Sequence, residues 1–162
     1  MGEIRFRLLT DTELESLSEE FIQFLVVQGI DDQMWRDINT KTPEKANDLV
    51  SVFSDTVLKK VYSKVQFMSF VSEQVFSIFK IEAQKMHVVV IKNLSKDLAF
   101  KDIEDVITRL KKDLNDFNAF TATRELGSGI LDEIHALTEK GCLIAEQYLW
   151  KQFEHYHKKT SK

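Results

Sequence analysis

Residues 64–93 decide the fold class of this chain, and they read KVQFMSFVSEQVFSIFKIEAQKMHVVVIKN. Three segments of this stretch alternate apolar and other side chains or are rich in β-branched residues, as β-strands are. They are KVQFMSFV, VFSIFKIE and MHVVVIKN. Short polar joins separate them at residues 72–74 and 83–85. Because joins this short connect antiparallel neighbours, the stretch predicts an antiparallel β-meander.

A long helical pattern lies near the start of the chain. The segment LLTDTELESLSEEFIQFLVVQGI predicts a first helix that begins with a capping box at Thr10 and ends at Gly29. Most of its apolar residues follow helical spacing, but Ile22, Val26 and Val27 widen the apolar stripe near its C-terminal end. That end is therefore expected to be either deeply buried or a docking surface.

Two further helices are predicted before the meander. The second is short and takes Asp31 or Asp32 as its cap, and the third has Thr42 as N-cap and Pro43 as its first residue. A short helix of this kind is marginal by itself in water, so its apolar face must pack against something.

The chain returns to helical and strand signals after the meander. A helix is predicted around residues 100–113, and a fourth strand at FNAFTATRE, residues 117–125. The loop LGSG follows, and residues 130–157 form either one helix or a helical hairpin about Gly141. Runs of helices and strands, rather than strict alternation, predict an α+β fold in which N-terminal helices precede a β-meander, a crossover helix, a fourth strand and the C-terminal helical region.

Length and charge bound the classes of function. With 162 residues, the chain fits a single domain over residues 1–162, with a tail that frays from about residue 158. Its 22 basic and 26 acidic residues give a net charge of −4, and the lysines are dispersed, which argues against a nucleic-acid partner. The longest apolar runs, FLVV and HVVVI, fall far short of the roughly 20 residues that cross a bilayer.

The expected location is the cytoplasm. The single cysteine cannot form an internal disulfide, and the N-terminus MGEIRFRLLTDTELE lacks the basic and then apolar segments of an export signal.

Four segments carry a resemblance to a known group of proteins: RFRLLTDTELESLSEEFIQFLVVQGID, TPEKANDLVSVFSDTVLKKV, FKIEAQKMHVVVI and EKGCLI. They resemble a family of short, uncharacterised cytoplasmic proteins of the Bacteroidota. The resemblance covers most of the chain and is weakest from Asn93 to Ile130, and the shared features are core and capping residues. It implies a cytoplasmic bacterial protein and supplies no catalytic residues.

Cys142 is the one thiol, and it follows Gly141 within a short distance of His135. A catalytic thiol needs a lowered pKa, but no sequence signature of a cysteine enzyme surrounds this one. The favoured interpretation is structural: Gly141 takes the left-handed position after a helix, and Cys142 makes the apolar contact back to Leu137. We therefore expect no catalytic residue here.

Two carboxylate–histidine pairs raise the question of a metal site. Asp132 and His135 lie three residues apart, as do Glu154 and His157, so that each pair shares one helix face. A di-iron site in a helical bundle needs further buried carboxylates from two other helices, and the sequence shows none. We expect no metal and no other cofactor.

The loop from Gly127 to Gly129 is a possible anion site, with Arg124 as a nearby counter-charge. It lacks the third glycine of a dinucleotide fingerprint and the lysine of a P-loop, and Ser128 serves equally well as a helix cap. The alternative function that it supports is a small-ligand-binding protein or an enzyme.

The favoured function is a non-enzymatic, cytoplasmic protein-interaction or structural module that binds an unidentified protein or itself. The wide apolar stripe near the end of the first helix and the short second helix carry this prediction. The predicted partner-binding residues are Phe24, Val27, Met34 and Trp35.

Overall fold

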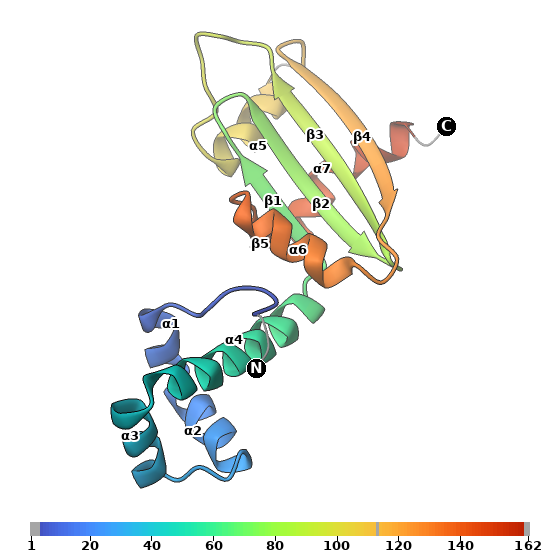
Figure 1. Ribbon diagram of the computed structural model, residues 1–162. Coiled ribbons are helices and arrows are strands. Elements are labelled where there is room, and N and C mark those ends of the chain that lie inside the picture. The colour runs from blue at the N-terminus through green and yellow to red at the C-terminus, as the bar shows by residue number, and fades with distance from the viewer. Residues whose placement is uncertain (1–3, 113, 161–162) are drawn as a thin grey trace. The chain divides into compact units, whose positions relative to one another are not determined.

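The computed structural model describes residues 4–112 and 114–160, which contain seven helices and five strands. Their order confirms the predicted α+β class, with helices first and a β-meander next (Figure 1). By internal contacts the chain divides into two compact units, residues 1–63 and residues 64–162. The single domain inferred from the chain length stays a prediction.

The N-terminal unit is helical, and its described helices are α1 (Asp11–Ser16), α2 (Ser18–Val27), α3 (Asp32–Lys41) and α4 (Pro43–Ser63). The prediction of one first helix was wrong, because the chain leaves helical geometry at Leu17, with φ −109° and ψ 22°. The hydroxyl of Ser16 donates to the carbonyl of Glu13, and this local bond competes with continuation of the helix. The predicted end is confirmed, since Gly29 follows α2 with a φ of +76°.

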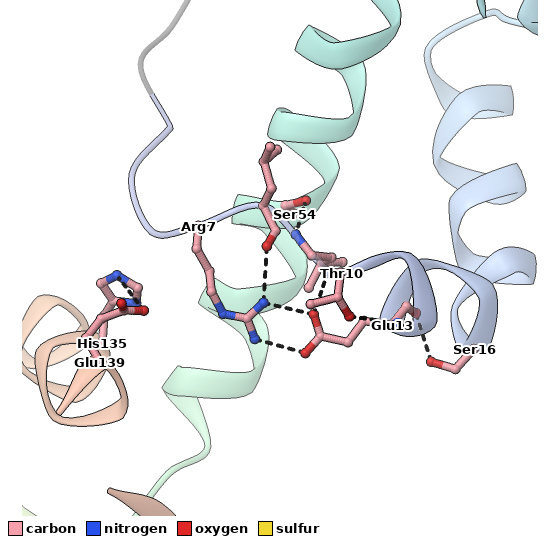
Figure 2. A network of polar contacts seen from close by, with 9 residues as sticks. Arg7, Thr10, Glu13, Ser16, Ser54, His135 and Glu139 are labelled. Atoms are coloured by element: carbon pink, nitrogen blue, oxygen red, sulfur yellow. Dashed lines mark hydrogen bonds and ion pairs between the residues drawn. The ribbon is translucent and has the colours of Figure 1, made fainter. Parts of the chain in front are cut away.

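The predicted capping box at Thr10 is confirmed and is extended by an arginine (Figure 2). Thr10 Oγ1 accepts from the backbone N–H of Glu13 at 3.2 Å, and the Glu13 carboxylate accepts from the backbone N–H of Thr10 at 2.8 Å. Arg7 donates to both oxygens of that carboxylate, at 2.8 and 2.9 Å. The bonds from Arg7 and then from Thr10 lower the pKa of Glu13 to about 2.

Helix α4 organises the N-terminal unit. Its Asp55 carboxylate accepts from the backbone N–H groups of Arg5 and Phe6, at 2.7 and 3.0 Å, and Ser54 Oγ accepts from the N–H of Leu9 at 3.1 Å. The ring of Phe6 meets Tyr62 edge to face at 5.1 Å. The segment before α1 is therefore held along α4 rather than left in solvent. Pro43 is the first residue of α4, as predicted.

The C-terminal unit is built on one sheet. Its elements are β1 (Phe67–Val71), β2 (Val75–Glu82), β3 (Lys85–Asn93), α5 (Ile103–Lys112), β4 (Phe117–Glu125), α6 (Ile130–Glu139), β5 (Leu143–Ala145) and α7 (Gln147–Thr160). The strand order is β4-β3-β2-β1-β5, and every neighbouring pair is antiparallel. The predicted meander and fourth strand are confirmed, and the helix predicted as a crossover, α5, joins two antiparallel neighbours.

The turn between β2 and β3 contains two residues, Ala83 and Gln84, which both have a positive φ, of 50° and 64°. Glu82 and Lys85 pair across it. Two left-handed residues in a two-residue loop match the twist of the flanking strands.

Helices cover both faces of the sheet in the C-terminal unit, with α5 and α7 on one side and α6 on the other (Figure 1). The core between the sheet and the first pair of helices joins residues such as Phe76, Ile78 and Val89 to Trp150 and Phe153. Side chains alternate between faces along each strand, so Phe70, Ser77 and Phe79 belong to the opposite face, under α6.

The C-terminal region has two helices rather than one, but they do not form the predicted helical hairpin, because a short strand lies between them and they cover opposite faces of the sheet (Figure 1). Helix α6 ends at Lys140, and Gly141 adopts a φ of +97°. The chain then forms β5, which pairs with β1 through residues 143–145. Helix α7 runs to Thr160, and the rest of the tail that was predicted to fray lies outside the described residues.

Candidate functional site

The four predicted partner-binding residues separate into two pairs in the structure. Phe24 and Trp35 turn into an aromatic cluster, in which both approach Phe21. Trp35 meets Phe21 edge to face at 5.1 Å, and Phe24 lies 5.4 Å from Phe53 of α4. Both predicted residues are half-buried. The cluster therefore ties α2, α3 and α4 together from within the unit.

Val27 and Met34 instead face outward, with 82% and 45% of their surfaces exposed. Ile22 and Val26 are exposed as well, at 59% and 64%, and their spacing of four residues places them on one side of α2. We call Ile22, Val26 and Val27 the α2 surface. The wide apolar stripe in the sequence indicated these three residues, but the sequence did not show whether they would be buried or exposed.

The α2 surface lies in an acidic part of the chain. Residues 1–63 carry twelve acidic and seven basic side chains, although the whole chain has a net charge of only −4. Glu19 and Glu20 occupy the first turn of α2, and both are exposed. Glu19 precedes Ile22 by three residues and so lies on the same side of the helix.

Cys142 occupies the predicted position after α6. Its backbone N–H donates to the carbonyl of Leu137 at 3.0 Å, and the N–H of Gly141 donates to the carbonyl of Thr138 at 3.0 Å. These two bonds form the Schellman motif, so the predicted helix end, with Gly141 in the left-handed position and Cys142 following it, is confirmed. Burial raises the pKa of the Cys142 thiol, and the charge of Lys140 offsets this only in part. A raised pKa is the opposite of what a nucleophilic thiolate needs.

The carboxylate–histidine pairs do not join into one metal-binding group. Within residues 4–112 and 114–160, no three histidine, cysteine, aspartate or glutamate side chains stand close enough to hold an ion. His157 lies instead beside two other rings, with centroids 4.9 Å from His87 and 5.9 Å from Trp150. His87 shares a hydrogen bond of 2.9 Å with the hydroxyl of Thr123.

The loop at Gly127–Gly129 leads into α6, but its surroundings are negatively charged. Gly129 is the N-cap, and no side chain caps the helix. Asp132 and Glu133 lie in the first turn, and Glu133 forms an ion pair with Arg124, the counter-charge predicted for an anion. Arg124 is therefore already paired with a carboxylate and does not serve as the counter-charge of an anion at this loop.

A cavity of about 400 Å³ lies close to this loop, between α6 and the face of the sheet beneath it. Its apolar lining includes Phe70, Phe79 and Met86 of the sheet and Leu137 of α6. The sequence did not predict this cavity, because its two sides come from segments that are far apart along the chain.

The polar lining of the cavity includes three charged side chains, Arg124, Glu133 and Lys140. Two smaller side chains, the buried Ser77 and Cys142, complete the wall. Of the three charged groups, Arg124 and Glu133 neutralise each other, whereas Lys140 forms no ion pair within the described residues. The cavity therefore combines an apolar interior with one uncompensated positive charge.

A comparison with protein families places most of the chain in a known family. The model of a family described as a family of unknown function (DUF6495) matches residues 4–158. No curated protein and no solved structure matches the sequence. In the described part of the chain, even the longest helix, the 21-residue α4, lacks an apolar stretch that could cross a membrane.

Proposed function

Because the chain belongs to the DUF6495 family, whose function is unknown, we propose a function from its own structure: the N-terminal unit binds a basic, amphipathic helix of another protein. The exposed α2 surface carries this proposal. The favoured function from the sequence, a protein-interaction module without enzymatic activity, is thereby given a surface and a kind of partner.

The α2 surface has the properties of a binding site that is ready before its partner arrives. Its three side chains are β-branched, so few rotamers are lost when they are covered. The aromatic cluster of Phe21, Phe24, Trp35 and Phe53 fixes α2 from behind. A rigid apolar ridge with a spacing of four residues suits the groove of a second helix.

The acidic side chains around the α2 surface favour a basic partner. The exposed Glu19 and Glu20 border the ridge, in a unit whose acidic side chains outnumber its basic ones. A partner helix with lysine or arginine beside its apolar stripe therefore meets complementary charge, whereas a second copy of this acidic unit meets like charge.

The proposed location is the bacterial cytoplasm, which rests on the family resemblance and on a chain with a single, buried thiol. The predicted partner residues keep distinct roles in this proposal. Val27 contacts the partner directly. Met34 is a further exposed apolar residue of the N-terminal unit. Phe24 and Trp35 do not contact the partner but hold α2 in place through the aromatic cluster.

A displayed library of random peptides, selected on the full-length chain, tests the proposal. We expect enriched peptides with apolar residues at helical spacing and flanking lysine or arginine. Val26→Asp should weaken their binding about thirtyfold, the effect of an interface hot spot of about 2 kcal/mol. Leu98→Asp is the matched control, since Leu98 is similarly exposed, at 53%, but lies in the other unit.

Ile22→Ser gives a second, milder variant, and a melting curve of each variant shows that it is folded. Binding measured by fluorescence anisotropy should weaken as salt is added, because the charges that meet are exposed. Enrichment of peptides that bind the Val26→Asp chain equally well, or of acidic peptides, would contradict the proposal. Self-association that Val26→Asp abolishes would replace the foreign helix with a second copy.

A further inference from the structure

We propose that the cavity between α6 and the sheet is a binding site for a small molecule with an apolar body and one carboxylate group. The site is formed by the C-terminal unit alone, so this inference is independent of the proposed function of the α2 surface.

Two small side chains create the cavity. Ser77 stands opposite Phe70 on β1 and two residues before Phe79 on its own strand, so that a hydroxymethyl group is placed among aromatic neighbours. Cys142 is the corresponding small residue on the side of α6, held there by its bond to Leu137. Larger side chains at these positions would fill the space, and the structure leaves about 400 Å³ instead. That volume is within the usual range of small-molecule sites.

The interior selects an apolar body for the ligand. Phe70, Phe79 and Met86 line it from the sheet, and Leu137 lines it from the helix. Phe70 and Phe79 are only half-buried although they lie on the inner face, so the protein itself does not cover them fully. An aliphatic or aromatic group in the cavity would remove this surface from water.

The charged side chains of the lining favour a ligand with a single negative charge. Arg124 and Lys140 bring two positive charges to the lining, and Glu133 brings one negative charge. Since Glu133 is paired with Arg124, the ammonium group of Lys140 is left to receive an anion. Lys140 is exposed, so its side chain can reach a carboxylate without the cost of burying a charge. One uncompensated charge fits a carboxylate better than a doubly charged phosphate.

Methionine methyl signals provide a local readout of binding in the intact chain. The sequence contains four methionines, of which Met86 lines the cavity and Met34 is exposed in the N-terminal unit. We would titrate full-length protein labelled at the methionine methyl groups with octanoate. A saturable shift of the Met86 signal without a shift of the Met34 signal is expected. Octan-1-ol and octylammonium, which share the apolar body, should bind at least fivefold more weakly.

Two variants and a control identify the groups that bind. Lys140→Gln should weaken octanoate binding roughly fivefold, as expected for an exposed ion pair. Its effect on octan-1-ol should be small. Lys151→Gln, at an exposed lysine of α7 outside the cavity, should change neither affinity. Ser77→Leu should abolish the Met86 shift by filling the cavity, and its melting curve shows whether it is folded.

Three results would overturn this proposal. The first is a Met86 signal that does not shift saturably, and the second is an affinity for octylammonium equal to that for octanoate. The third is an octanoate affinity that Lys140→Gln leaves unchanged. A shift of Met34 alone would show that octanoate binds the N-terminal unit instead. None of these results bears on peptide binding by the α2 surface, so failure of one proposal is distinguishable from failure of the other.

Discussion

Among single residues, His157 is harder to protonate in the folded chain than an ordinary histidine. Burial lowers its pKa below the ordinary histidine value of 6.5, and the nearby His87 and Lys80 lower it further. Lys80 itself lies 3.2 Å from Glu82, and its ammonium group stands over the Trp150 ring. The unfolded chain therefore binds a proton at His157 more readily than the folded chain does, so stability must rise with pH around this value.

We predict that the free energy of unfolding falls as the pH is lowered from 7.5 to 5.5 and that His157→Gln reduces this fall. Glu13 contributes little to the change in this range, because its pKa of about 2 in the folded chain and its ordinary value of 4.5 in the unfolded chain both lie below pH 5.5. Urea midpoints measured at several pH values check the prediction. His155→Gln, at an exposed histidine of the same helix, is the control, and identical pH profiles for the wild type and His157→Gln would contradict the role of His157.

Cys142 should be unreactive in the folded protein. It is 7% exposed, and burial raises its pKa, so little thiolate is present at neutral pH. A thiol reagent is expected to label it slowly in native protein and at once in urea. Cys142→Ala should cost about 1 kcal/mol of stability, as expected for the loss of one buried heavy atom. Rapid native labelling would show instead that the site opens or that the thiol is activated.

At the scale of elements, the β2–β3 turn carries avoidable strain. Ala83 and Gln84 both have a positive φ, a conformation that asparagine and glycine adopt more readily than they do. The double change Ala83→Asn with Gln84→Gly should therefore stabilise the protein by about 1 kcal/mol. Thermal melts check this expectation. Gln74→Gly is the control in the join between β1 and β2, where Gln74 does not have a positive φ. This change should destabilise the protein, because glycine increases the conformational entropy of the unfolded chain.

The aromatic cluster holds the helical unit together, and Trp35 is its contribution from α3. Because its indole is half-buried against Phe21, Trp35→Ala should cost about 2–3 kcal/mol, below the range for a fully buried ring. Trp35→Phe should restore part of this loss by keeping an edge-to-face contact. Chemical denaturation of both variants measures the difference. An unchanged midpoint for Trp35→Ala would mean that α3 does not depend on this contact.

The elements that could be predicted from sequence are those with local signals. Gly29 and Gly141 mark helix ends because only nearby backbone groups decide their conformation. The span of β4 was predicted to the residue, from its composition and its flanking loops. The strand β5 was missed because its three residues carry no pattern of their own and are defined by pairing with β1, about 75 residues earlier.

The candidate sites show the same limit. The sequence indicated that the end of the first helix had too many apolar residues to bury, but only packing shows that Phe24 faces inward and Val27 outward. Leu137 and Cys142 were correctly joined by the helix-end motif. Ser77 carries no signal of a site in the sequence, because it is a single polar residue within an apolar strand, yet it lines the cavity.

At the scale of the whole molecule, the family match from residue 4 to residue 158 spans both compact units. The core cluster of the sheet unit contains residues between Phe67 and Phe153, and the five described strands pair with one another within residues 64–162. The N-terminal unit, at 63 residues, is near the size below which a core alone gives marginal stability. The family model thus covers the helical unit as well as the sheet unit.

We predict that residues 64–162 fold when they are expressed without the helical unit. The expected result is a cooperative thermal transition with the far-ultraviolet signature of a sheet, because that unit has an apolar core of its own between the sheet and helices α5 and α7. Residues 1–63 alone should melt at a lower temperature. A fragment 64–162 that melts without cooperativity would show that its core depends on the helices.

The strand order also determines how this sheet could join another. Strand β4 occupies one edge with nine residues, and the three-residue β5 occupies the other. A strand from another molecule needs a row of unpaired backbone N–H and C=O groups to pair with. Of the two edge strands, β4 offers the longer row. Growth from a single edge closes after two molecules around a twofold axis, whereas a fibre needs two usable edges. Pairing of folded molecules through the β4 edge would therefore stop at two copies and would not extend into a fibre.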